Sequence, residues 1–162
     1  MPEGATEIVE ADLARAEHAE ALVRLLNEYA LHPMGKGSEL SGYVKANLAT
    51  ELRARKARVI LAYVDGTAAG LMICLEGFST FACRPLLNIH DVVVTDKHRG
   101  KGLAKLMFER AEAIARALGC CKITLEVLEG NRAAQAVYKS LGFAGYELDP
   151  KMGKAMFWQK LL

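Results

Sequence analysis

The chain shows its architecture most plainly in the stretch Asn88-Ile-His-Asp-Val-Val-Val-Thr-Asp-Lys-His-Arg-Gly-Lys-Gly-Leu-Ala-Lys-Leu106. Its first half is apolar and β-branched, which predicts a strand, and its last residues begin a helical pattern. Between them lies a glycine-containing basic loop. A helix start leaves backbone N–H groups unpaired at the positive end of the dipole, so this layout predicts a phosphate site. The cations of the loop would stand beside the phosphate: Arg99, Lys101 and Lys105.

Two common phosphate loops do not match this stretch. A dinucleotide fingerprint needs a third glycine three places after Gly102, where the chain has Lys105, and the glycine spacing and Lys-Ser or Lys-Thr of a P-loop are absent. The run Arg99-Gly100-Lys101-Gly102-Leu103-Ala104 instead resembles the acyl-CoA pyrophosphate loop of the GNAT superfamily of N-acetyltransferases. An ordinary solvated connection is the alternative, although basic residues at a helix start are unfavourable without an anion.

A second block strengthens the resemblance: Asn131-Arg-Ala-Ala-Gln-Ala-Val-Tyr138-Lys-Ser-Leu-Gly142-Phe143. In the superfamily, an Asn at this helix start binds the pantetheine arm, and a Tyr seven residues later is the general acid near the thioester sulfur. Asn131 and Tyr138 match both positions. Folding alone offers another interpretation, because Asn is a good N-cap and Tyr138 lies on a helix face with apolar residues.

The resemblance implies an acetyl-CoA-dependent N-acetyltransferase that transfers the acetyl group directly to an amine in a ternary complex, with no metal. The C-terminal half is closest in spacing to polyamine (diamine) acetyltransferases. The residues expected to bind the acyl-CoA cosubstrate are Val92, Val93, Val94, Arg99, Gly100, Lys101, Gly102, Leu103, Ala104, Lys105, Asn131, Ala134 and Tyr138.

The expected catalytic residues are Tyr138 as acid and His90 as base. His90 stands where polyamine acetyltransferases have an acidic residue, and an imidazole titrates close to neutrality. A half-buried structural histidine is the alternative. Strand alternation predicts that His90 and Asp91 lie on opposite faces. Weaker candidates for binding the acceptor substrate are Glu28, Tyr29, Phe81, His90 and Glu126.

The acceptor stays open, because a histidine in place of a carboxylate weakens the case for a polyamine. An amino acid, a peptide N-terminus or an amine-bearing antibiotic fits equally well. A non-catalytic acyl-CoA-binding sensor or interaction module is the main alternative function. A nucleic-acid-binding protein is disfavoured by a formal net charge of only +2 and by the absence of a recognised motif.

Composition is that of one soluble globular domain, expected to span residues 1–162. The chain has 52% hydrophobic and 25% charged residues, and no apolar run long enough to span a bilayer. The N-terminus lacks a secretory signal pattern, so a cytoplasmic location is expected, without a membrane or nucleic-acid partner. The four cysteines have no metal spacing and are expected to be free thiols. A homodimer is a further expectation.

The expected fold is α/β (α+β), GNAT-like, with a mixed, mostly antiparallel central sheet of about 6–7 strands flanked by about four helices. Asp65-Gly66 predicts a tight hairpin turn, and the loop after position 94 lies within a β-α-β crossover. The predicted strands are 6–10, 59–64, 68–75, 86–94, 122–127, 145–147 and 155–161. Asp12 is the expected cap of a first helix reaching Leu31, and Ser41 the start of the second.

Overall fold

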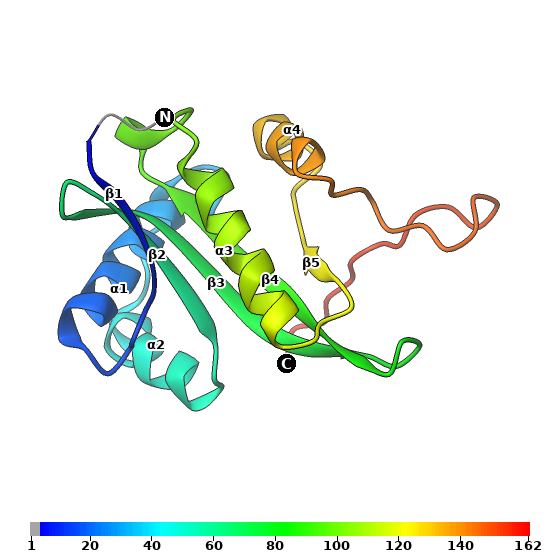
Figure 1. Cartoon of the computed structure of the whole chain (residues 1–162), viewed down its shortest axis with the longest axis horizontal. Coiled ribbons are helices and arrows are strands. Elements are labelled where there is room, and N and C mark those ends of the chain that lie inside the picture. The colour runs from blue at the N-terminus through cyan, green and yellow to red at the C-terminus, as the bar shows by residue number, and fades with distance from the viewer. Residues whose placement is uncertain (1–3) are drawn as a thin grey trace. The chain divides into compact units, whose positions relative to one another are not determined.

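The computed structural model describes residues 4–162 (Figure 1). The chain divides into two compact units, one that ends at Glu126 and one that begins at Val127.

The first unit contains a five-stranded sheet in the order β1-β2-β3-β4-β5. The first four strands pair antiparallel with their neighbours, and β5 joins β4 in parallel through the predicted crossover. Asp65 and Gly66 both have positive φ, as a two-residue hairpin turn requires. The bounds of the strands are β1 Thr6–Glu10, β2 Arg58–Val64, β3 Thr67–Ser79, β4 Arg84–Val94 and β5 Ile123–Leu125.

Helices cover both faces of this sheet (Figure 1). On one face, Leu22 of α1 and Leu52 of α2 belong to a cluster with Leu61, Leu71 and Ile73 of the strands. On the other face α3 packs so closely that a Cβ at Gly70 would lie 3.1 Å from the Met107 side chain. The bounds of these helices are α1 Ala16–Leu31, α2 Gly42–Ala54 and α3 Leu103–Ala117, with a 3-10 turn at Asp96–His98.

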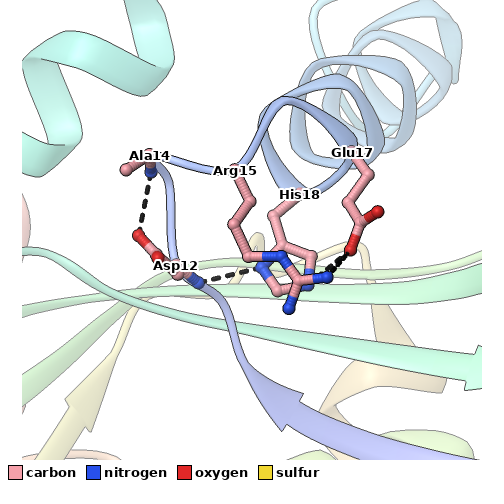
Figure 2. A network of polar contacts seen from close by, with 5 residues as sticks. All are labelled: Asp12, Ala14, Arg15, Glu17 and His18. Carbon is pink, nitrogen blue, oxygen red and sulfur yellow. Dashed lines mark hydrogen bonds and ion pairs between the residues drawn. The ribbon is translucent and has the colours of Figure 1, made fainter.

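The start of α1 differs from the predicted one. The helix begins at Ala16, and its N-cap residue, Arg15, makes no side-chain cap. Figure 2 shows the reason: the Asp12 carboxylate accepts the Ala14 N–H at 2.9 Å, while buried His18 accepts the Asp12 N–H at 2.9 Å through Nδ1. Asp12 therefore closes a turn before the helix and does not cap it. Ser41 does cap α2, accepting the Val44 N–H.

The second unit contains one helix, α4, which spans Arg132–Ser140. The two last predicted strands do not form there: Glu147 and Lys154 make an isolated bridge, and no strand follows. A lone pair of short segments has too little cross-strand contact to be stable by itself. The sheet therefore has five strands among the described residues and not 6–7, while the fold class is confirmed.

Candidate functional site

The β4 strand carries a bulge at the site of the expected base. Ile73 pairs with Asp91, but the next residue of β3, Cys74, pairs with Ile89, so His90 has no partner across the ladder. Directly opposed residues share a face of the sheet. Asp91 therefore lies on the face of Ile73, which α1 and α2 cover, whereas Ile89 lies on the face of Cys74. The bulge breaks the alternation on which the predicted separation of His90 and Asp91 depends.

The second half of β4 has an open edge in the first unit. β5 pairs only with Leu87, Asn88 and Ile89. From His90 to Val94, the side of β4 facing away from β3 thus has no strand partner between residues 4 and 126. The backbone amides of Val92 to Val94 that point this way are available to a ligand with peptide-like amides lying alongside the strand.

The basic loop folds onto itself between β4 and α3. His98 donates its N–H to the Thr95 carbonyl at 2.9 Å, and its Nδ1 lies 2.8 Å from the Thr95 hydroxyl. The Arg99 guanidinium donates to the Val94 carbonyl at 3.2 Å and pairs with Asp96 at 3.0 Å. Arg99 thus holds the loop in shape in this structure, and the exposed Lys101 supplies unpaired positive charge beside it.

The two loop glycines take the conformation that an anion cradle needs. Gly100 and Gly102 have φ values of +72° and +81°, and a Cβ at either would meet no atom within 4 Å. Gly102 is the N-cap of α3 and provides no side-chain cap. The first turn of α3 therefore has no side-chain cap at the positive end of the helix, an arrangement that suits an anion such as a pyrophosphate.

In the second unit, Asn131 caps α4, since its side-chain oxygen accepts the Ala134 N–H at 3.2 Å. Tyr138 lies two turns later, with its ring centroid 6.1 Å from that of Phe143. The Tyr138 carbonyl accepts the N–H groups of Leu141 and Phe143, which closes the helix before Gly142. The predicted Asn and Tyr positions thus lie at opposite ends of one short helix.

The weaker acceptor candidates are not all brought together. Phe81 lies in the turn that joins Ser79 to Arg84 and is 92% exposed. That turn is six residues along β3 from Ile73, the partner of Asp91, or about 20 Å at the rise of a strand. Glu28 pairs with Arg24 on α1 at 4.0 Å. Glu126 follows β5 at the end of the first unit.

Tyr29 does lie near the β4 bulge, and its neighbour there is Asp91, which was not among the predicted site residues. Burial raises the pKa of the Tyr29 phenol, and the charge of Asp91 raises it further. Burial likewise raises the pKa of the Asp91 carboxyl, partly offset by the nearby His90 imidazole. A charged residue in the middle of an apolar strand was the sequence signal that could have identified Asp91.

Neither a membrane-spanning helix nor a metal site finds support among residues 4–162. None of the helices described there has the length and hydrophobicity that crossing a membrane requires. In the same part of the chain, no three His, Cys, Asp or Glu side chains are grouped so that they could hold a metal ion.

Comparison with known proteins gives a consistent result. The chain is 24% identical over 127 residues to thialysine N-epsilon-acetyltransferase of Caenorhabditis elegans, covering 78% of each chain. It is 35% identical over 85 residues to streptothricin acetyltransferase of Streptomyces lavendulae, covering 52% of this chain and 43% of that one. Its fold matches the crystal structure of a possible acetyltransferase from Clostridium difficile 630, with a TM-score of 0.77, 22% identity and coverage of 97% and 98%. The model of the acetyltransferase (GNAT) family matches residues 19–143, which is most of the chain. This protein therefore belongs to the acetyltransferase (GNAT) family.

Proposed function

We propose that this chain is an N-acetyltransferase that moves the acetyl group of acetyl-CoA directly to a primary amine of a small molecule or peptide, in a ternary complex. The observation that carries the proposal is the continuous path from the open edge of β4 through the glycine loop to the uncapped start of α3. It offers amides for an extended arm and N–H groups for phosphates, in a chain of the matching family.

The reaction makes three demands on the protein. The thioester supplies an acetyl group that an uncharged amine can attack. The protein must therefore remove a proton from the amine, polarise the carbonyl oxygen and provide a proton for the departing sulfur. The backbone N–H groups of Val92 to Val94 are proposed for the carbonyl oxygen. The Tyr138 hydroxyl is proposed as the acid for the sulfur, and His90 is the sequence-based candidate for the base.

Binding of the cosubstrate is assigned to the same elements. We assign the pyrophosphate to the N–H groups from Lys101 to Lys105 and to the positive charge of the loop, and the pantetheine arm to β4 and Asn131. The family match runs from residue 19 to 143 and therefore includes residues of both compact units. We therefore propose that residues 1–162 work as one acetyltransferase domain.

The acceptor is proposed only as a primary amine. The relatives named above are acetyltransferases of thialysine and of streptothricin, which are different acceptors. Their diversity is consistent with a common cosubstrate site and a variable acceptor site.

The test is release of free CoA by the purified full chain. Acetyl-CoA would be incubated with L-lysine, spermidine or an unblocked tripeptide, and the product identified by mass spectrometry. The proposal predicts acetylated product with at least one amine and no product without enzyme. Tight binding of acetyl-CoA without product from any amine would instead support a non-catalytic acyl-CoA sensor.

A further inference from the structure

The second half of β3 has a neighbouring strand on one side only. β2 pairs with β3 as far as Cys74, which lies opposite Arg58. The chain enters β2 from α2 through a turn in which Lys56 has a φ of +55°, so β2 starts no earlier. Among residues 4–162, no strand pairs with the side of 75–79 that faces away from β4. We call this side the free edge of β3.

The free edge belongs to a hairpin that extends past the rest of the sheet. Residues 75–79 pair with 84–88 of β4, but β5 joins β4 only from Leu87 onward. The joined ends of β3 and β4 therefore extend beyond the other strands (Figure 1). A hairpin of two strands is marginally stable in water, so a third strand added here would stabilise it.

Side chains along the free edge alternate in exposure. Leu75, Gly77 and Ser79 are half-buried on one face, whereas Glu76 and Phe78 are exposed on the other. Phe78 is 59% exposed, although phenylalanine is usually among the buried residues. The segment contains no lysine or proline of the kind that protects an edge from pairing. Its unpaired N–H and C=O groups are therefore a template for another strand.

The other edges of the sheet suit this role less well. The outer edge of β1 carries the charged residues Glu7 and Glu10, which disfavour pairing. The edge of β4 from 90 to 94 is assigned to the cosubstrate. β5 has only the three residues Ile123–Leu125. Short edge strands are a common protection against pairing.

We propose that the free edge of β3 is a homodimer interface, in which two copies of the chain pair residues 75–79 antiparallel about a twofold axis at Gly77. In this register, Glu76 lies opposite Phe78 of the second copy, and Leu75 lies opposite Ser79 of the second copy. The inference does not depend on the acetyltransferase function. It specifies the surface of the expected homodimer.

The length of the free edge favours a second copy as its occupant. An added antiparallel strand lies on the line of β2, where it meets Arg58 directly after the position opposite Leu75. Residues 75–79 of a second copy fit this space, because β3 ends at Ser79 and the chain then turns toward its own β4. A longer extended peptide would collide with β2 at that point. The edge is thus complementary to itself, as a twofold interface requires.

Phe78 provides the apolar part of the contact. On the exposed face, the two copies of Phe78 become diagonal neighbours across the twofold axis, a separation that aromatic side chains can bridge. Five residues from each copy bury much less than the roughly 1,600 Å² of a standard interface. Interfaces of this small class are typical of weak, transient complexes. We therefore expect a dimer that dissociates on dilution.

Sedimentation equilibrium of the full chain, from low to high micromolar concentration, tests the proposal with two substitutions of Phe78. Phe78→Glu places a carboxylate opposite Glu76 of the second copy, twice in each dimer, whereas Phe78→Lys places an opposite charge there. Like charges directly opposed destabilise a strand pair, and opposite charges stabilise it. We expect Phe78→Glu to raise the dissociation constant of the dimer at least about tenfold, and Phe78→Lys to stay within about threefold of the wild type.

The matched control is Tyr43→Glu, the same kind of change at a 74% exposed aromatic residue of α2, which should leave the dissociation constant unchanged. Circular dichroism and thermal melting would show that each variant folds. Hydrogen exchange provides a second measurement. Backbone amides of 75–79 should exchange more slowly at high than at low concentration in the wild type, and equally fast at both in Phe78→Glu.

A wild-type chain that stays monomeric at the highest concentration would overturn the proposal. A dimer that is equally stable in both Phe78 variants would place the interface elsewhere and would overturn it as well. Equal weakening by the two opposite charges would exclude the register that sets Glu76 against Phe78. None of these outcomes bears on the acetyltransferase function, which is tested by release of CoA.

Discussion

At the scale of single residues, Gly102 shapes the start of α3. Its φ of +81° lies in the left-handed region, where an alanine costs about 1–2 kcal/mol. Gly102→Ala should lower the free energy of unfolding by about that amount and also weaken acetyl-CoA binding, because a methyl group enters the space assigned to the pyrophosphate. Chemical denaturation and isothermal titration calorimetry would measure the two effects.

Gly37 provides the matched control for this strain. Its φ is +74°, and a Cβ there would likewise meet no atom within 4 Å, but it lies in the connection between α1 and α2. Gly37→Ala should cost similar stability and leave acetyl-CoA affinity unchanged. Equal affinity losses in both variants would mean that strain, and not the phosphate cradle, explains the effect.

Tyr138 can be tested by removal of its hydroxyl alone. If the hydroxyl provides a proton to the departing sulfur, Tyr138→Phe should lower kcat by about 10²- to 10⁴-fold with little change in acetyl-CoA affinity. Stopped assays of CoA release and equilibrium binding would separate the two quantities. Tyr43→Phe, at a 74% exposed position on α2, is the control. Normal turnover by Tyr138→Phe would exclude the hydroxyl from the mechanism.

The cysteines should differ sharply in reactivity. Cys74 is fully buried, and burial raises the pKa of its thiol to about 12, whereas Cys83 is exposed. Only the thiolate reacts, so at pH 8 a maleimide should label Cys83 in the native protein and reach Cys74 only after denaturation. Peptide mass spectrometry would locate the labels. Rapid native labelling of Cys74 would show that this part of β3 opens.

Residue type predicted some helix caps correctly and one wrongly. Ser41 and Asn131 cap their helices as residue type suggested, but Asp12 closes a turn because His18, six positions away, holds its backbone. The separation of His90 and Asp91 onto opposite faces stays a prediction, because the bulge interrupts the alternation on which it was based. Simple alternation assumes a regular strand, and the register shift that breaks it depends on pairing with β3, which no local pattern reveals.

At the scale of elements, the glycine loop before α3 depends on the packing of this helix against the sheet. Met107 is fully buried where the helix meets the sheet, against Gly70 of β3. Met107→Ala should lower the free energy of unfolding by about 2–5 kcal/mol, the usual range for truncating a core residue. Glu109→Ala, which changes an exposed side chain on the same helix, should stay within about 0.5 kcal/mol of the wild type. Urea denaturation would compare them. Similar stability of both variants would mean that α3 does not pack as the structure shows.

The elements of the first unit could be predicted well because each has a strong local signal. The Asp65-Gly66 turn, the β-branched run of β4 and the apolar periodicity of α3 all appear where expected. The strand ends were less predictable. β3 continues to Ser79 and β4 begins at Arg84, so most residues between the predicted strands 68–75 and 86–94 are themselves in strands. Cross-strand pairing extended both strands beyond their apolar patterns.

At the scale of the whole molecule, the five strands of the first unit correspond to five of the predicted strands, while 145–147 and 155–161 lack strand structure. Those segments had suitable residue types, but a strand also needs a partner, and local sequence does not supply one. Side chains of this last segment are exposed, among them Phe157 and Trp158. The homodimer and the cytoplasmic location stay predictions, of which sedimentation equilibrium would test the first.

The central claim is that the protein binds acetyl-CoA, and thermal stability measures it most directly. The purified chain would be melted with acetyl-CoA, CoA, NAD or ATP at equal concentrations. A ligand at a hundred times its dissociation constant stabilises the folded state by about 2.7 kcal/mol, which raises the melting temperature by several degrees in a domain of this size. The account predicts such a shift with acetyl-CoA and CoA alone. No shift with either, or a shift with NAD or ATP instead, would contradict it.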